Sequence, residues 1–415
     1  MMETVTTGSR RFLPPIVAAC LAMSAVAWAS PARAETQADS RIATAVARLA
    51  QDPALGRNLG VHVRDVAFNR SVTGIRADRG FIPASTMKVV TAFTSLASMG
   101  ADHRFVTTVW MPAPGRLVLE GGGDPVLTRS DLSRLAKKTK RKLKKKDLPL
   151  RVLVDYDDDI FAPPTNAPGW EAGDMPAYIS AVRGLTILGS YSADTSRVAA
   201  DAFVAALRAR KVQASVGSRA DAESGATRLA RFRGNDVGEA IAVMMPPSEN
   251  NVAEILFRHV ALTEDQPASW EGASLAAVEV LEDEGVDTGE STIVDGSGLS
   301  YANRLTPELL TEVLSGIDAD ERFATARDSM PIAGVNGTLI RRFAAWPASC
   351  ARGEVSAKTG SLPMTVSTLA GFTTGADGRR KAFAVLVNDR PYSAAWSATS
   401  LAIDSIAAAV HGCVR

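Results

Sequence analysis

The fold can be inferred first from residues 355–388, whose sequence is VSAKTGSLPMTVSTLAGFTTGADGRRKAFAVLVN. Three segments of this sequence are rich in β-branched and aromatic residues, and short polar turns separate them, as is typical of antiparallel strands. The predicted strands cover residues 355–359, 368–374 and 382–388. A further apolar segment, residues 394–411, predicts a helix that ends at Gly412.

The N-terminal part of the chain adds two strands to this pattern. Residues 60–67 alternate apolar and polar side chains, and a turn leads into a second strand at 71–77. A short amphipathic helix is predicted before them, at 39–51, and a long apolar helix after them, at 84–99. Two strands from one end of the chain and three from the other predict an α+β fold, in which an antiparallel five-stranded sheet is flanked by helices.

The residues between these two parts are predicted to form an inserted domain. We place the N-terminal part of the main domain at 35–100, the insertion at 101–244 and the C-terminal part at 245–415. Within the insertion the expected elements are strands at 116–120 and 150–155, helices at 129–143 and 197–210, and a polar loop at 214–226. Eight of the ten residues 137–146 are Lys or Arg. We expect a solvated helix face there, and contact with an anionic wall polymer or a membrane surface is the alternative.

Residues 1–34 are predicted to be a secretory signal peptide. Arg10 and Arg11 precede an apolar run at 12–29, which ends in the small-x-small sequence Ala32-Arg33-Ala34. A retained membrane anchor is the alternative, because the run is close to spanning length. Export by the general secretory route or by the twin-arginine route stays open. We expect no transmembrane span after cleavage, and therefore an exported protein of the periplasm or the extracytoplasmic cell-wall space.

Composition excludes several classes of protein. Hydrophobic residues make up 46% of the chain and charged residues 22%, a globular balance that excludes wholesale disorder. The net charge of +1 does not indicate a global nucleic-acid footprint. The four histidines are scattered along the sequence, and the three cysteines include no Cys-x-x-Cys pair. We therefore expect no metal site. Cys20 lies in the predicted signal peptide, so Cys350 and Cys413 are expected to form a disulfide, with two free thiols as the alternative.

The first candidate catalytic motif is Ser85-Thr86-Met87-Lys88, at the start of the helix predicted at 84–99. A spacing of three residues brings the Ser85 hydroxyl and the Lys88 amine to one face of a helix. A lysine in a partly dry site can lose its proton and activate a serine as a nucleophile. Alone this motif is a weak signal, because most Ser-x-x-Lys matches are solvated helix surface.

The second motif is Ser248-Glu249-Asn250, which follows two prolines and precedes an apolar helix. The ordinary interpretation of Ser248 is a helix N-cap. The functional interpretation is that the Ser248 hydroxyl relays a proton and the Asn250 amide holds a substrate carbonyl.

The third motif is Lys358-Thr359-Gly360-Ser361, at the end of the first strand of 355–388. Gly360 would let another backbone approach the strand closely. Lys358 and Thr359 offer a cation and a hydroxyl to a substrate carboxylate. The backbone N–H of Ser361 could pair with that of Ser85 as an oxyanion hole. An exposed strand end is the alternative.

Together, in this order and these contexts, the three motifs are the signature of serine acyltransferases that recognise penicillin. The chain resembles the class C low-molecular-mass penicillin-binding proteins, the D-Ala-D-Ala carboxypeptidase and endopeptidase family of penicillin-binding protein 4 type. Family-like segments are GGGDP (121–125), APGW (167–170), DGSGLS (295–300) and AGVNGTL (333–339). This family carries an inserted domain between its first two motifs, which fits the separation of Ser85 and Ser248. Glu249 stands where aspartate is more usual.

The resemblance implies a transpeptidase/β-lactamase-like fold and an enzyme acting on peptidoglycan stem peptides and cross-links, without metal or organic cofactor. It also implies acylation by β-lactam antibiotics. By this resemblance Ser85 is the nucleophile and Lys88 is its base. Ser248, with Lys358, returns a proton to the leaving amine. The N–H groups of Ser85 and Ser361 bind the oxyanion, and Thr359 with Lys358 binds the substrate carboxylate.

Two alternatives from other classes remain. An exported β-lactam-hydrolysing enzyme would need a dedicated deacylation base, which we do not locate in the sequence. A catalytically inactive wall-binding protein is the other, and the intact motif residues argue against it. The sequence does not decide between carboxypeptidase and endopeptidase activity.

Overall fold

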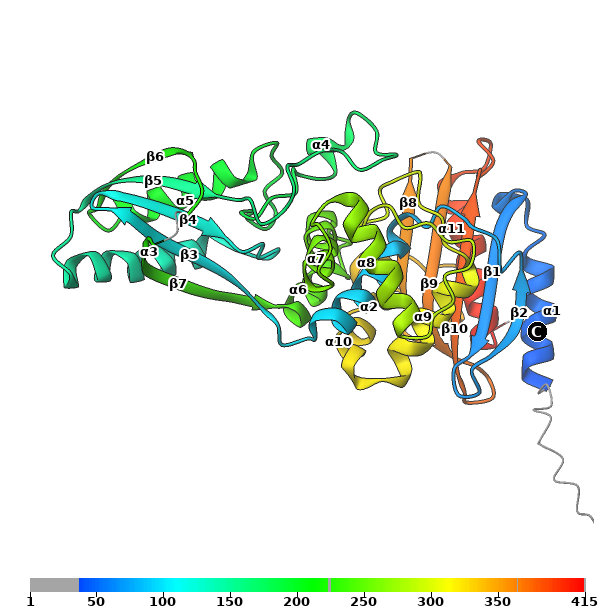
Figure 1. Cartoon of the computed structure of the whole chain (residues 1–415). Helices are drawn as coiled ribbons and strands as arrows, with labels where there is room; N and C mark the ends of the chain where they lie inside the picture. The colour runs from blue at the N-terminus through cyan, green and yellow to red at the C-terminus, as the bar shows by residue number, and fades with distance from the viewer. Residues whose placement is uncertain (1–36, 223–224, 364, 414–415) are drawn as a thin grey trace, which may run out of the picture. The chain divides into compact units, whose positions relative to one another are not determined.

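The strands of the main sheet come from both ends of the chain. The computed structural model in Figure 1 describes residues 37–222, 225–363 and 365–413. Its first sheet contains β1 (Asn58–Asp65), β2 (Arg70–Ile75), β8 (Val355–Leu362), β9 (Val366–Thr374) and β10 (Arg380–Asn388). The strand order is β2-β1-β10-β9-β8, and every neighbouring pair is antiparallel. The prediction of this sheet is confirmed. The signal-peptide prediction falls on residues 1–34, outside the described residues.

Helices cover both faces of this sheet (Figure 1). Side chains alternate between the two faces along a strand, so in β10 Phe383 and Val385 pack with α1 (Gln37–Leu49) and α11 (Trp396–His411). Ala384 and Leu386 join the opposite cluster. That cluster contains α2 (Met87–Met99), α7 (Asn250–Thr263), α8 (Trp270–Asp283) and α9 (Pro307–Ala319). The smaller helices are α4 (Asp174–Ala177), α6 (Val237–Met244) and α10 (Ala324–Asp328).

A second five-stranded sheet lies between the first two motifs in the chain. Its order is β6 (Gln213–Arg219), β5 (Arg151–Asp157), β4 (Arg116–Gly121), β3 (Arg104–Ala113) and β7 (Thr227–Asp236). The pairs β4–β5 and β5–β6 are parallel, whereas β3 pairs antiparallel with β4 and β7. Helices α3 (Arg129–Lys145) and α5 (Thr195–Arg208) share its apolar core.

The prediction of a loop at 214–226 is wrong, because β6 covers most of the first half of this segment. This strand lies at the edge of the sheet and is largely exposed, so it lacks the apolar alternation that would have marked it. The edge strand β7 was likewise not predicted, since four of its ten residues are Arg or Asp.

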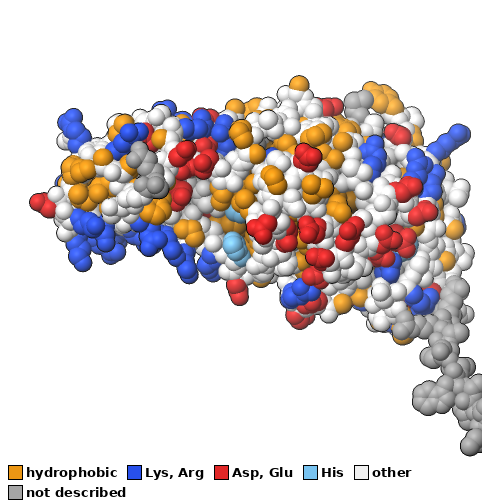
Figure 2. Space-filling view, in the orientation of Figure 1, with side chains coloured by type: hydrophobic (Ala, Val, Ile, Leu, Met, Phe, Trp, Pro, Cys, Tyr) orange, Lys and Arg blue, Asp and Glu red, His pale blue; other side chains and the backbone are white. Residues whose placement is uncertain are grey.

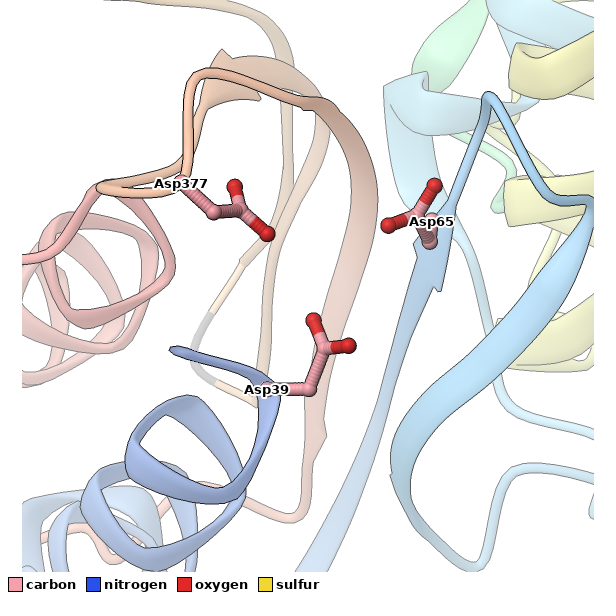
Figure 3. A group of neighbouring side chains, drawn as sticks. All are labelled: Asp39, Asp65 and Asp377. Carbon is pink, nitrogen blue, oxygen red and sulfur yellow. The ribbon is translucent and has the colours of Figure 1, made fainter. Parts of the chain in front are cut away.

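A buried charge cluster fastens α1 to the main sheet. Asp39, Asp65 and Asp377 turn their carboxylates toward a common space (Figure 3). Lys381 is fully buried there, and its Nζ donates to Asp39 Oδ1 at 3.0 Å, Asp65 Oδ2 at 2.6 Å and Asp377 Oδ2 at 3.0 Å. Arg379 pairs with all three carboxylates as well. The lysine ammonium therefore occupies the position that a cation between these carboxylates would take.

A disulfide closes the C-terminal end of the fold. Cys350 and Cys413 are bonded, with 5.9 Å between their Cα atoms and a separation of 63 positions in the sequence. The bond joins the 3₁₀ turn at Ala348–Ala351 to the residue that follows the α11 cap at Gly412.

Candidate active site

Ser85 lies in a tight turn rather than in the α-helix predicted to start at 84. The turn is a 3₁₀ segment, Ala84–Thr86, and α2 begins directly after it at Met87. Ala84 has a φ of +47°, a strained conformation for an L residue. Gly298, at φ +80°, packs against this turn so closely that a Cβ would lie 1.8 Å from the Ala84 carbonyl oxygen. Backbone packing therefore fixes the position of Ser85.

Lys88 lies one turn further on and contacts Ser85. Its Nζ donates to Ser85 Oγ at 3.1 Å, to Asn250 Oδ1 at 2.7 Å and to the Ser297 carbonyl oxygen at 2.7 Å. The side chain is fully buried. Burial lowers the pKa of Lys88 to about 8, against the opposing charges of Glu254 and other carboxylates. The amine can therefore lose its proton near neutral pH and accept one from the serine.

The second motif contributes Asn250 directly. Asn250 is the first residue of α7; its Oδ1 accepts from Lys88, and its Nδ2 donates to the Tyr178 carbonyl oxygen at 2.9 Å. Ser248 is half-buried at φ +67°, and its hydroxyl makes no hydrogen bond to any residue that the structure describes. The N-cap position of α7 belongs to Glu249, so Ser248 is not the helix cap of the ordinary interpretation. The structure thus joins Asn250, but not Ser248, to the Ser85–Lys88 pair.

The third motif lies on β8 beside the first. Lys358 is fully buried, and its Nζ donates to the Thr359 carbonyl oxygen at 2.8 Å. Burial, and then the nearby Lys88 cation, lower the pKa of Lys358 well below its ordinary value. The Thr359 hydroxyl donates to Thr338 Oγ1 at 2.7 Å. Two lysines thus share a dry site in which a second positive charge is disfavoured.

Gly360 lets β8 pass close to the Ser85 turn. A Cβ on Gly360 would lie 2.8 Å from the Pro83 carbonyl oxygen and 2.9 Å from the Ser85 backbone nitrogen. The Thr368 hydroxyl, on β9, donates to the same Pro83 oxygen at 2.8 Å. Ser361 is exposed and lines the cavity that contains Ser85. The close approach predicted for this glycine is therefore made to the backbone of the nucleophile motif.

The cavity beside Ser85 has a volume of about 460 Å³. Besides Ser85, Asn250 and Ser361, it is lined by carboxylates, aromatic rings and the 298–299 turn. These residues are Glu171, Asp174, Tyr178, Tyr301, Trp396, Gly298, Leu299, Leu362 and Pro363. The 295–300 segment, one of the family-like segments of the sequence, lines the cavity through Gly298 and Leu299. Asp295 holds its shape by accepting from the Gly298 and Ser300 amides and from the Trp170 indole.

Glu254, a fully buried carboxyl next to this site, was not predicted from the sequence. Its oxygens accept from the backbone N–H groups of Gly296 at 3.0 Å and Ser297 at 2.7 Å. Burial, and then the charge of Asp295, raise the pKa of Glu254 to about 8. A signal was available: Glu254 follows Asn250 by one helical turn and is the only charged residue in the apolar run VAEILF at 252–257.

The sequence of the chain is similar to those of known carboxypeptidases. The sequence matches the family described as D-Ala-D-Ala carboxypeptidase 3 (S13) over residues 42–193 and 180–410, which include all three motifs. The chain is 32% identical over 399 residues to carboxypeptidase DacB of Mycolicibacterium smegmatis, a match that covers 90% of this chain and 84% of that protein.

Solved structures share the fold. Penicillin binding protein 4 (dacB) of Haemophilus influenzae superimposes with a TM-score of 0.74 at 23% identity, covering 87% of this chain and 97% of that one. A second structure of that protein, complexed with a β-lactam, has a TM-score of 0.66. Bd3459, a predatory peptidoglycan endopeptidase of Bdellovibrio bacteriovorus, has a TM-score of 0.56 at 19% identity and covers 84% and 90% of the two chains. The expected fold class is confirmed.

Proposed function

The chain belongs to the D-Ala-D-Ala carboxypeptidase 3 (S13) family, and on that premise we propose that it is a serine-type enzyme working through an acyl-enzyme on Ser85. The substrates we propose are peptidoglycan stem peptides that end in D-Ala-D-Ala. The observation that carries the proposal is the buried Lys88 amine, 3.1 Å from Ser85 Oγ, with a pKa lowered to about 8. A solvated helix face would leave this lysine charged and unable to act as a base.

The first half of the reaction forms the acyl-enzyme. Neutral Lys88 takes the proton of Ser85 Oγ as the oxygen attacks the carbonyl carbon of the penultimate D-Ala. The backbone N–H groups of Ser85 and Ser361 stabilise the oxyanion. The C–N bond then breaks, and the leaving amine takes a proton from the Ser248 hydroxyl, which in this proposal takes one in turn from protonated Lys358. The products are free D-Ala and an ester on Ser85.

The second half hydrolyses that ester. Water gives a proton to Lys358, which is neutral after the first half, as it attacks the ester carbonyl. The C–O bond to Ser85 breaks, and Ser85 takes back its proton from Lys88. A β-lactam enters by the same attack, but its opened ring stays attached to the acyl group. The amine therefore does not leave, and we expect slow deacylation.

The terminal carboxylate of the substrate is assigned to Thr359 and Lys358. The pKa of Lys358 is lowered by burial and then by Lys88. A bound carboxylate would supply the opposite charge and raise the pKa of Lys358 again. Protonation of this lysine is then coupled to substrate binding, which fits a group that must later release a proton.

Endopeptidase activity is a second part of the proposal. Cleavage of a D-Ala–diaminoacyl cross-link forms the same acyl-enzyme and differs only in the leaving amine. Asn250, whose amide nitrogen points to the Tyr178 carbonyl beside the cavity, would contact the acyl part that both substrates share. Purified cross-linked and uncross-linked muropeptides, compared by product analysis, test the two activities separately.

We also propose that the protein is exported and acts outside the cytoplasm, as the predicted signal peptide implies. The Cys350–Cys413 disulfide is the kind of bond that persists in oxidising compartments. Over the residues that the structure describes, no helix is both long enough and apolar enough to cross a bilayer.

Intact-protein mass spectrometry after benzylpenicillin tests the mechanism. We expect one penicilloyl adduct on the wild-type protein and none on Ser85→Ala. Ser95→Ala is the matched control, because Ser95 is buried in the following helix and its hydroxyl has no partner among the described residues. Rapid turnover of a chromogenic cephalosporin would instead favour a β-lactam-hydrolysing enzyme. The absence of an adduct on correctly folded protein would refute the proposal that the protein is a serine acyl-enzyme.

A further inference from the structure

A densely charged surface lies on α3, which packs on the second sheet and contains none of the three motifs. Residues 129–146, which form α3 and its cap, contain ten Lys or Arg and one Asp. Figure 2 shows Lys and Arg side chains gathered at the lower left, over α3 and β7 of Figure 1. Of the 46 Lys and Arg in the chain, 36 lie elsewhere, together with 44 Asp and Glu. The charge is therefore strongly polarised.

This surface extends from α3 onto the edge strand β7. The Lys138 amine donates to the Arg231 carbonyl oxygen at 3.1 Å, so the helix and the strand are in contact. Arg134 and Lys138 both lie over the ring of Phe232, at 5.6 and 5.7 Å from its centroid. β7 adds three arginines at its surface, Arg228, Arg231 and Arg233. We call the Lys and Arg side chains of 129–146 and of β7 the basic face.

Acidic side chains do not neutralise the basic face. None of the eight Lys and Arg at 137–146, and none of the three β7 arginines, forms an ion pair with an acidic group in the part of the chain that the structure describes. Arg134 alone has such a partner, Asp131. A dense set of uncompensated cations is costly in self-repulsion unless counter-ions or an anionic partner lie against it.

We propose that the basic face is a docking surface for an anionic phospholipid bilayer. Most cations of 129–146 are lysines, point charges on flexible stems that suit dispersed phosphate groups rather than a single bidentate site. The apolar side of α3, including Leu132, Leu135 and Leu143, is buried in the second sheet's core. No large apolar side chain of α3 or β7 is exposed, so the contact is electrostatic and without insertion.

The charge of the remaining chain favours a planar partner over a polymer network. The residues outside 129–146 carry more acidic than basic groups and are repelled by an anionic environment that surrounds them. An anionic bilayer meets only one end of the molecule, so it attracts the basic face while the acidic remainder stays in solution. This inference goes beyond the proposed function and does not depend on the chemistry of Ser85.

Vesicle co-sedimentation tests the proposal with the mature chain. We expect binding to phosphatidylcholine vesicles that contain about 30% phosphatidylglycerol at about 50 mM salt, and loss of binding at high salt because ions screen exposed charges. The variant Lys137→Gln/Arg141→Gln/Lys144→Gln removes three exposed cations of the basic face. Each of the three cations contributes about fivefold to the affinity for anionic vesicles, so the triple variant should bind them about 100-fold more weakly.

The matched control removes three exposed arginines elsewhere. Arg41→Gln/Arg48→Gln/Arg57→Gln makes the same charge change near α1 and should leave vesicle binding within about twofold, since distant charges are screened. Circular-dichroism spectra and thermal melts that match those of the wild type show that each variant is folded. Three results would overturn the proposal: equal binding to pure phosphatidylcholine, equal loss in both variants, or binding to isolated cell-wall sacculi without binding to the anionic vesicles.

Discussion

The pH dependence of acylation should report the ionisation of Lys88. Only the neutral amine can take the Ser85 proton, so the rate rises with pH as Lys88 loses its proton. With a pKa of about 8, roughly one lysine in ten is neutral at pH 7. At the ordinary value of 10.5 the neutral fraction would be roughly 300-fold smaller. We therefore expect acylation to rise about tenfold from pH 6 to 7 and to level off near pH 9.

Glu254 should modify this profile. Its own pKa of about 8 lies in the same range, and its ionised form raises the pKa of Lys88. As the pH rises, the new negative charge holds the proton on Lys88 more tightly, so the curve is shallower than a single titration. In Glu254→Gln this charge is absent at every pH. The midpoint should then move to lower pH and the rise should steepen.

The same variant should also lower the plateau rate. Glu254 accepts from the Ser297 amide, and the Ser297 carbonyl in turn accepts from Lys88. Glutamine replaces one of the two acceptor oxygens with an NH₂ group, which cannot accept from a backbone amide. We expect a loss of about tenfold in the plateau, the scale of one weakened hydrogen bond to a charged group. A role in folding alone would change the plateau without moving the midpoint.

The assay is the second-order rate of acylation by a fluorescent penicillin, measured from pH 5.5 to 9.5 at constant ionic strength. Glu279→Gln, an exposed glutamate on α8, is the control that should leave both plateau and midpoint unchanged. A wild-type midpoint near 10 would refute the lowered pKa of Lys88. An unshifted midpoint in Glu254→Gln would refute its electrostatic coupling to Glu254.

Three further perturbations test the packing of the site and the stability of the fold. Gly360→Ala should slow acylation about 100-fold, because its Cβ would lie 2.2 Å from Thr368 Oγ1 and 2.9 Å from the Ser85 nitrogen, the oxyanion donor that we propose. Lys381→Met should cost about 3–5 kcal/mol in the free energy of unfolding by urea, because it removes the fully buried cation and leaves three carboxylates with Arg379 as their only shared cation among the described residues. Removing the Cys350–Cys413 bond as a double serine variant should cost about 4 kcal/mol for a loop of 63 residues.

The Gly360 and Lys381 variants each have a control on the same chain. Gly173→Ala places a Cβ where nothing lies within 4 Å, so acylation should be unchanged. Lys146→Met removes an exposed lysine and should change the unfolding free energy by less than about 0.5 kcal/mol. Equal acylation by Gly360→Ala and wild type would contradict the close approach of β8. Unfolding of Lys381→Met at the wild-type urea midpoint would contradict a stabilising charge cluster.

The main sheet was predictable because its strands carry their own burial signal. In β9 and β10 nearly every side chain is buried, so the apolar runs in 355–388 stand out in the sequence. The second sheet was predicted only in part, because its outer strands are polar. β6 and β7 lie at its two edges, and β3 carries buried threonines at 107 and 108 in place of an apolar alternation. Their pairing depends on neighbours far away in the chain, which no local pattern records.

The site shows where local patterns stop being informative. The Ser85–Lys88 contact is local, since three residues make nearly one helical turn, and it was predicted on that basis. The other two acceptors of the Lys88 amine are Asn250 and the Ser297 carbonyl, from segments more than 150 residues away. Asn250 was found through its motif, whereas a backbone carbonyl has no residue type that could mark it.

The distant partners of Lys88, rather than its local contact with Ser85, decide whether the Ser-x-x-Lys motif can act in catalysis. A Ser-x-x-Lys pair on a solvated helix has a charged lysine that cannot act as a base, and the same pair in a dry pocket has a lysine that can. Here the pocket is closed by α7 and by the 295–300 loop, whose amides Glu254 holds in place. The basicity of Lys88 is therefore a property of tertiary packing. A substitution at Glu254, which makes no direct contact with Lys88 in the described structure, must therefore change the pKa of Lys88 and the pH profile of acylation.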